Sequence, residues 1–122
     1  MQLFGSWLHQ TRELQKSAYD TDPPLLRGEE WRAYMRWNTL AAQVELGEAI
    51  QEVPWKPWAV DLEPTQEELL KFAKEQVDVL HFIGNMLCAA GVTDDVLSDL
   101  YLEKMRINEA RQATGTYTGR NG

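Results

Sequence analysis

The chain has 122 residues, of which 43% are apolar and 25% charged, and its formal net charge is −7. This size and composition predict one globular domain, and the acidity argues against nucleic-acid binding, which needs an excess of basic residues. Cys88 is the only cysteine, which excludes a disulfide framework and indicates a reducing, cytoplasmic compartment. The most apolar stretch, residues 79–92, is too short to cross a bilayer, and no secretory signal is recognisable, so we expect no membrane partner.

Helical patterns follow one another along the chain, and no strand pattern competes with them. The first covers about residues 3–19, where apolar side chains recur at helical spacing, and it ends at the Asp20–Pro24 break. The second covers about residues 29–53 and is expected to stop before Pro54. Residues 55–58, which contain two tryptophans and a proline, then form a rigid aromatic connector.

Two further helices complete the pattern. The third is predicted over about residues 65–90 and begins with a capping-box sequence at Thr65. The fourth is predicted over about residues 94–112, and two acidic residues stand in its first turn, as the helix dipole favours. The chain is therefore predicted to be an all-α, four-helix bundle over residues 1–113, followed by a flexible tail over residues 114–122.

Two pairs of carboxylates stand at helical spacing. Glu45 and Glu48 share one face of the second helix, and Glu75 and Asp78 repeat the spacing on the third. Apolar residues surround Asp78, which predicts that it has no solvated face and is protonated, paired with a cation or bound to a metal. Facing pairs would repel by roughly 4 kcal/mol per contact at an effective dielectric near 20, and divalent cations would reverse that sign. Ligation by oxygen alone indicates Mg²⁺, with Mn²⁺ as a substitute.

These residues also allow other interpretations. Asp78 and His81 are three residues apart, as in di-iron bundles, but such bundles need a carboxylate–histidine pair on each of two helices. The remaining histidine, His9, has no acid three residues before it, which argues against di-iron. Glu45 and Glu48 alone are typical of a solvated helix surface. On that interpretation the chain is a non-catalytic acidic helical module that binds a protein partner.

Positive charge gathers near the end of this acidic chain. Lys104, Asn108 and Arg111 are spaced i, i+4 and i+7, so they lie on one side of the predicted fourth helix. An ammonium, an amide and a guanidinium in a row suit a polyphosphate. Taken alone, the two charges are better explained by a favourable interaction with the negative end of the helix dipole.

Taken together, the motifs resemble those of a known superfamily. The two carboxylate pairs, separated by 26 residues, resemble the signature of the all-α, MazG-like nucleoside triphosphate pyrophosphatases. The segment 53–58 is similar to the tryptophan–lysine–x–tryptophan connector of dimeric dUTPases, and residues 75–82 resemble their third-helix motif. Residues 101–117 resemble the closing motif of these enzymes and of the bifunctional dCTPase–dUTPases of large phages.

This resemblance implies a Mg²⁺-dependent pyrophosphohydrolase that converts dUTP, with dCTP as a second candidate substrate, to the monophosphate and pyrophosphate. Attack at the β-phosphorus is implied, and we expect Glu48 to be the general base that activates the attacking water. The remaining expected roles are metal binding by Glu45, Glu48, Glu75 and Asp78, phosphate binding by Lys56, Lys104 and Arg111, and base or sugar binding by Gln10, Asn38, Trp55 and Asn108. A homodimer or higher homo-oligomer is implied too, as is a phage protein in the host cytoplasm. The alternative enzyme is a house-cleaning pyrophosphatase for another deoxynucleoside triphosphate.

Overall fold

The computed structural model describes residues 2–60 and 62–115, and these residues form helices joined by turns, with no strand among them. The elements in chain order are α1 (Trp7–Tyr19), the short 3₁₀ helix η1 (Pro23–Leu25), α2 (Gly28–Ile50), α3 (Gln66–Ala89) and α4 (Asp94–Thr114). The predicted all-α class is confirmed. The predicted tail begins inside α4, since Thr114 is still helical, and its residues from 116 lie outside the described ranges.

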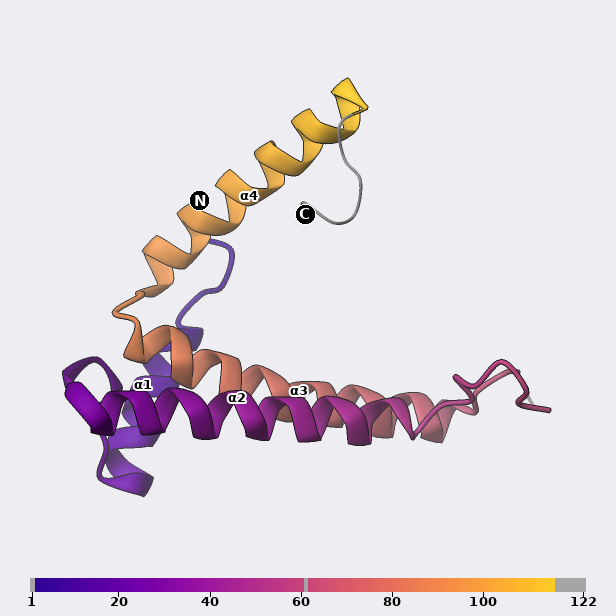
Figure 1. Cartoon of the computed structure of the whole chain (residues 1–122), viewed down its shortest axis with the longest axis horizontal. Coiled ribbons are helices and arrows are strands. Elements are labelled where there is room, and N and C mark those ends of the chain that lie inside the picture. Colours follow the sequence, from indigo (N-terminus) through magenta and orange to yellow (C-terminus); the bar gives the residue numbers. More distant parts are fainter. Residues whose placement is uncertain (1, 61, 116–122) are drawn as a thin grey trace.

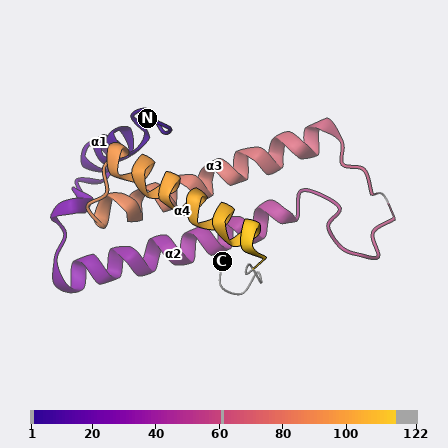
Figure 2. The same ribbon diagram turned by 90° about the horizontal axis from the view of Figure 1, so that it is seen from above.

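The two long helices α2 and α3 form an antiparallel hairpin, and α1 packs across one end of it (Figures 1 and 2). The capping box predicted for α3 is present: the Thr65 hydroxyl accepts from the Glu68 amide at 3.1 Å, and the Glu68 carboxylate accepts from the Thr65 amide at 2.7 Å. This reciprocal pair satisfies two of the backbone donors that a helix start leaves free. Local hydrogen bonding therefore explains where α3 begins.

Two helix boundaries differ from the prediction. The first helix was expected from about residue 3, but α1 begins at Trp7, because the preceding residues turn around Gly5, whose φ is +59°. The second helix was expected to reach Val53, but α2 ends at Ile50. The next three amides, those of residues 51–53, bond to carbonyls three residues back, which tightens the chain into 3₁₀-type turns ahead of Pro54.

The best-buried contacts lie where α1 crosses the hairpin. Leu8 of α1 is 2% exposed, and Cys88 and Ala89 of α3 are buried beside it. Gly84 allows the close crossing, since a Cβ atom there would stand 3.2 Å from the Trp7 ring and from the Thr11 hydroxyl. A side chain at this point would push α1 away from α3.

α4 is attached to the rest of the chain at its beginning. The Asp94 carboxylate accepts from the amides of Leu8 at 2.7 Å and His9 at 3.1 Å, and the Ser98 hydroxyl accepts from the Leu3 amide at 3.0 Å. The ring of Tyr101 meets that of Phe4 edge-on, with centroids 5.5 Å apart. Beyond these contacts α4 leans away from α2 and α3, and its last turns stand clear of them (Figure 1).

None of the helices in residues 2–60 and 62–115 is both long enough and apolar enough to cross a membrane.

Candidate functional site

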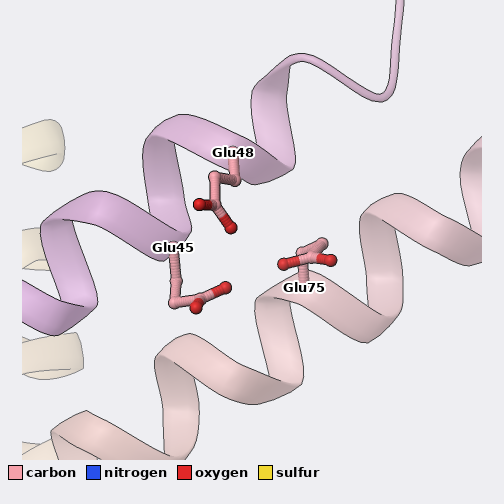
Figure 3. A group of neighbouring side chains, drawn as sticks. All are labelled: Glu45, Glu48 and Glu75. Atoms are coloured by element: carbon pink, nitrogen blue, oxygen red, sulfur yellow. The ribbon is translucent and has the colours of Figure 1, made fainter.

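Three glutamates from two helices converge between α2 and α3. Glu45 and Glu48 are one turn apart on α2, and Glu75 faces them from α3 (Figure 3). One carboxylate oxygen from each of the three lies within 4.8 Å of the others. Ala49, which follows Glu48 on α2, is completely buried. Folding thus brings Glu75 of one predicted pair to both members of the other pair, which lie on a separate helix.

The three carboxylates repel one another, and no cationic side chain among the described residues is paired with them. A hydrogen bond with Glu75, together with partial burial and repulsion from Glu48, Glu75 and Asp78, raises the pKa of Glu45 to about 7. Near neutral pH the Glu45 carboxyl therefore still holds a proton in part of the molecules. None of the ion pairs formed by the described residues involves these carboxylates. A divalent cation would replace that proton and cancel the repulsion, so the donor set, all of it carboxylate oxygen, fits Mg²⁺ or Mn²⁺.

Asp78 lies next to this group without belonging to it. Its charge contributes to the raised pKa of Glu45, but its oxygens are not among those within 4.8 Å. The expectation that Asp78 has no solvated face is wrong, since Asp78 is exposed. Its apolar neighbours Val77 and Leu80 are each 47% exposed too, so the apolar residues around Asp78 do not exclude solvent from it.

A cavity of about 480 Å³ adjoins the carboxylates between α1, α2 and α3. Its walls combine aromatic, amide and hydroxyl groups, with the two carboxylates of Glu45 and Asp78 among them. The lining residues are Thr11, Leu14, Gln15, Tyr19, Glu45, Asp78, His81, Phe82 and Asn85. A flat molecule bound here would therefore meet apolar rings and amides, and its far end would reach the carboxylates.

A chain of hydrogen bonds sets the orientation of one amide in this wall. The Asn38 side-chain NH₂ donates to the Tyr34 carbonyl at 2.8 Å, and the Asn85 NH₂ donates to the Asn38 amide oxygen at 2.9 Å. Because a backbone carbonyl can only accept, it fixes which way Asn38 points, and Asn38 in turn fixes Asn85. The Asn85 amide oxygen has no partner among the described residues, so it is left as an acceptor for a bound molecule.

A second amide in the same wall is held by a tyrosine. The Tyr34 hydroxyl donates to the Gln15 amide oxygen at 2.8 Å. Burial raises the pKa of the Tyr34 phenol, so it keeps its proton and stays a donor. The NH₂ group of Gln15 makes no hydrogen bond within the described part of the chain. The cavity thus offers one amide donor and one amide acceptor.

The structure places the other predicted site residues as follows. Asn38 lies in the hydrogen-bond chain behind the cavity, and Gln10 is exposed on α1 and does not line the cavity. Trp55 and Lys56 lie in the connector after α2, where the Lys56 ammonium stands 6.0 Å from the centroid of the Trp55 ring. Lys104, Asn108 and Arg111 lie in the second half of α4, and that half leans away from the α2–α3 hairpin (Figure 1). Their roles in binding stay predictions.

Several lining residues were not among the predicted site residues. Gln15 and Tyr19 of α1 are one turn apart, but nothing local to α1 shows that it crosses the hairpin at this point. Phe82 and Asn85 could have been found, because together with Asp78 they are spaced i, i+4 and i+7 along α3. That spacing continues the carboxylate face of α3 into the cavity.

Comparison with known proteins identifies one family. A family model described as dUTPase matches residues 9–94, and this range contains all four carboxylates and the whole cavity lining. The match ends at the first residue of α4, so the cationic residues of that helix lie outside it. No curated protein and no solved structure matches the chain.

Proposed function

The chain belongs to the all-α dUTPase family, which is related to the MazG-like pyrophosphatases, and we propose that it hydrolyses dUTP to dUMP and pyrophosphate with Mg²⁺. The observation that carries this proposal is the convergence of Glu45, Glu48 and Glu75 beside a cavity of about 480 Å³. Ligand pockets commonly have volumes of about 300–1,000 Å³. The cavity would hold the nucleoside, and the carboxylates would face its phosphates.

The three glutamates and Asp78 would hold the metal. When bound, Mg²⁺ would neutralise charge on the phosphates and lower the pKa of the attacking water. Glu48 is the most exposed of the three converging glutamates, so a water molecule can reach its carboxylate. We propose that Glu48 accepts the proton of this water as the water oxygen bonds to the β-phosphorus, and the bond from that phosphorus to the bridging oxygen breaks, so that dUMP leaves and pyrophosphate is formed. Glu45 and Glu75 would keep the phosphates in line for this attack.

The walls of the cavity favour uracil as the base. The Asn85 amide oxygen would accept a hydrogen bond from the N3–H group of uracil, whereas N3 of cytosine is itself an acceptor. Phe82 supplies an aromatic ring in the same wall, and the Gln15 amide can donate to a base carbonyl. An acceptor facing an acceptor leaves both unsatisfied, which costs about 1–3 kcal/mol. We therefore propose dUTP as the preferred substrate over dCTP by about 10- to 100-fold in kcat/KM.

The test is release of pyrophosphate from a panel of deoxynucleoside triphosphates, with Mg²⁺ and again after chelation. Glu48→Gln should abolish release, and Glu67→Gln is the matched control because Glu67 is an exposed acid at the start of α3. Asn85→Ala should reduce the preference for dUTP over dCTP. Release that survives chelation or Glu48→Gln would refute the proposed mechanism. A thermal shift with Mg²⁺ and a non-hydrolysable dUTP analogue separates the enzyme from a protein-binding acidic module, for which no shift is expected.

We also propose that the enzyme is a homodimer. Large apolar side chains are exposed along α2 and α3, including Trp37, Leu40, Val44, Leu69 and Leu80. A soluble monomer seldom exposes apolar residues in such continuous stretches, because covering them with a second copy is favourable. The cytoplasmic location and the phage origin stay predictions.

A further inference from the structure

Within residues 2–60 and 62–115, no contact is recorded for the side of α4 that faces away from α1. Asp94, Ser98 and Tyr101 make the contacts with α1 and the residues before it, and their i, i+4, i+7 spacing places them on one side of the helix. At about 100° per residue, Val96 and Leu100 point to the other side, where each is 44% exposed. α4 therefore presents an uncovered apolar surface along its first half.

This uncovered side continues into the cationic end of the helix. Lys104 lies four residues after Leu100, as Leu100 does after Val96, and Arg111 lies seven residues after Lys104. These spacings place all four residues on the same side of α4. Neither Lys104 nor Arg111 forms an ion pair with any described residue. Nη1 of Arg111 is enclosed and has no hydrogen-bond partner among those residues. An enclosed guanidinium nitrogen without an acceptor is unfavourable, and an anion would relieve it.

In this fold the cationic residues Lys104 and Arg111 of α4 do not reach the glutamates of the α2–α3 hairpin in the same chain. α4 is a continuous helix to Thr114, and the contacts of Asp94, Ser98 and Tyr101 fix its direction. Its outer half is directed away from the α2–α3 hairpin (Figure 1). Bringing Lys104 to the carboxylates of its own chain would break all three contacts at the base of the helix.

α2 presents a surface that is complementary to the uncovered side of α4. Apolar residues come first along both helices, and charged residues of opposite sign follow. Trp37, Val44 and Glu48 share one stripe of α2 at i, i+7 and i+11, and the first two are 71% and 60% exposed. This stripe changes from apolar to acidic in the direction of the chain, and the stripe on α4 changes from apolar to cationic. The α2 stripe is about 16 Å long and the α4 stripe about 22 Å, so α4 would extend past Glu48 by roughly one helical turn.

We propose that α4 is an arm that crosses to a second copy of the chain and brings Lys104 and Arg111 to the triphosphate held at that copy's carboxylates. This inference rests on the proposed function. In a two-fold symmetric dimer each copy gives its arm and receives the other, so neither active site is complete in a single chain. The apolar half of the arm covers Trp37 and Val44 of the partner, and the cationic half neutralises the phosphates.

The arm exchange is tested by heterodimers of two differently tagged chains, one with Glu48→Gln and the other with Lys104→Ala and Arg111→Ala. If the arm crosses, this heterodimer has one intact site and recovers about half of the wild-type rate of dUTP hydrolysis. If the arm serves its own chain, both sites are defective and nothing is recovered. A second heterodimer pairs a wild-type chain with a chain that carries all three changes. If the arm crosses, each of its two sites carries a defect, and its activity should not exceed that of the variant homodimers. If this second heterodimer is instead the more active of the two, the proposal is overturned. Arg106→Ala is the charge-matched control, since Arg106 lies on another side of α4.

A second readout does not depend on activity. A mixture of ¹⁵N-labelled and unlabelled wild-type chains is treated with a carbodiimide, which joins amines to carboxylates in direct contact. Exchange predicts links from Lys104 to Glu45 or Glu48 that pair a labelled with an unlabelled peptide, and Lys104→Arg should remove them. Links confined to one label, or a chain that is monomeric, would overturn the arm exchange. Mixed-label links in a protein that does not hydrolyse dUTP would support the exchange and refute the proposed function instead.

Discussion

The carboxylate of Asp94 caps α1 although it belongs to α4. Ser6, the residue before α1, makes no side-chain hydrogen bond to the helix, and Asp94 accepts from the amides of Leu8 and His9 in its place. Because Leu8 is buried, removing this acceptor leaves a backbone donor with no access to water. We expect Asp94→Ala to destabilise the start of α1 and the junction between α1 and α4 together.

The size of the effect follows from these two bonds. Replacing a helix cap by alanine costs about 1 kcal/mol and at most about 2, and hydrogen bonds to a charged group contribute about 1.5–3 kcal/mol. Loss of both bonds at Asp94 should lower the free energy of unfolding by about 2–3 kcal/mol. With about 2.1 cal/mol/K of unfolding entropy per residue over 122 residues, Tm should fall by about 8–12 °C.

The neighbouring residue provides the control. Asp95 stands in the same first turn of α4, so Asp95→Ala removes the same favourable interaction with the α4 dipole. Among the described residues its carboxylate bonds to the exposed Gln2 amide alone, so we expect a loss below about 1 kcal/mol. Thermal unfolding followed by circular dichroism at one fixed protein concentration measures both variants. Equal shifts in Tm would show that Asp94 does not cap α1.

Three further predictions concern the carboxylates, the α1 crossing and the amide chain. The pKa of Glu45 is about 7 in the folded chain against an ordinary 4.5, so the folded state holds a proton that the unfolded state releases. Without metal, the free energy of unfolding should therefore fall as pH rises from about 4.5 to about 7. In urea titrations with a chelator, Glu45→Gln should flatten this pH dependence, and an unchanged dependence would contradict the raised pKa of Glu45. Gly84→Ala places a Cβ atom 3.2 Å from Trp7 and Thr11 and should lower the free energy of unfolding by about 1–2 kcal/mol. Gly47 has open space around it, so Gly47→Ala should raise that free energy by about 0.5–1 kcal/mol. Urea midpoints that shift in the same direction for both variants would refute this expectation. Asn38→Ala removes the hydrogen-bond partner of Asn85 and should lower the free energy of unfolding by about 1–3 kcal/mol. It should also weaken the discrimination between dUTP and dCTP, measured as the ratio of their kcat/KM values. A ratio equal to that of the wild type would exclude a role for the hydrogen-bonded amides.

Features that depend on residues close together in the chain were predicted from the sequence. The start of α3 follows from Thr65 and Glu68, which bond to each other within one helical turn. The pairing of Glu45 with Glu48 on α2 follows from the same short-range periodicity. The all-α class and the family resemblance, which the family match confirms, rest on patterns of this kind.

Features that depend on distant residues appeared only in the folded chain. α1 begins at Trp7 rather than near residue 3, and the group that caps it lies 86 positions away at Asp94. The acceptor presented by Asn85 depends on Asn38, which is 47 positions away. The spacing of residues within a single helix does not show which distant residue it will contact.

The sequence by itself determined which residue types share a helix face, because a residue's neighbours at i+3 and i+4 are set by backbone geometry alone. It therefore identified four candidate carboxylates and a cationic end to the last helix. Only the tertiary structure decided that Glu75 meets Glu45 and Glu48, that Asp78 stays exposed beside them, and that the outer half of α4 leans away from the α2–α3 hairpin. The register and angle between helices are set by how side chains far apart in sequence interdigitate, and no local pattern encodes that fit.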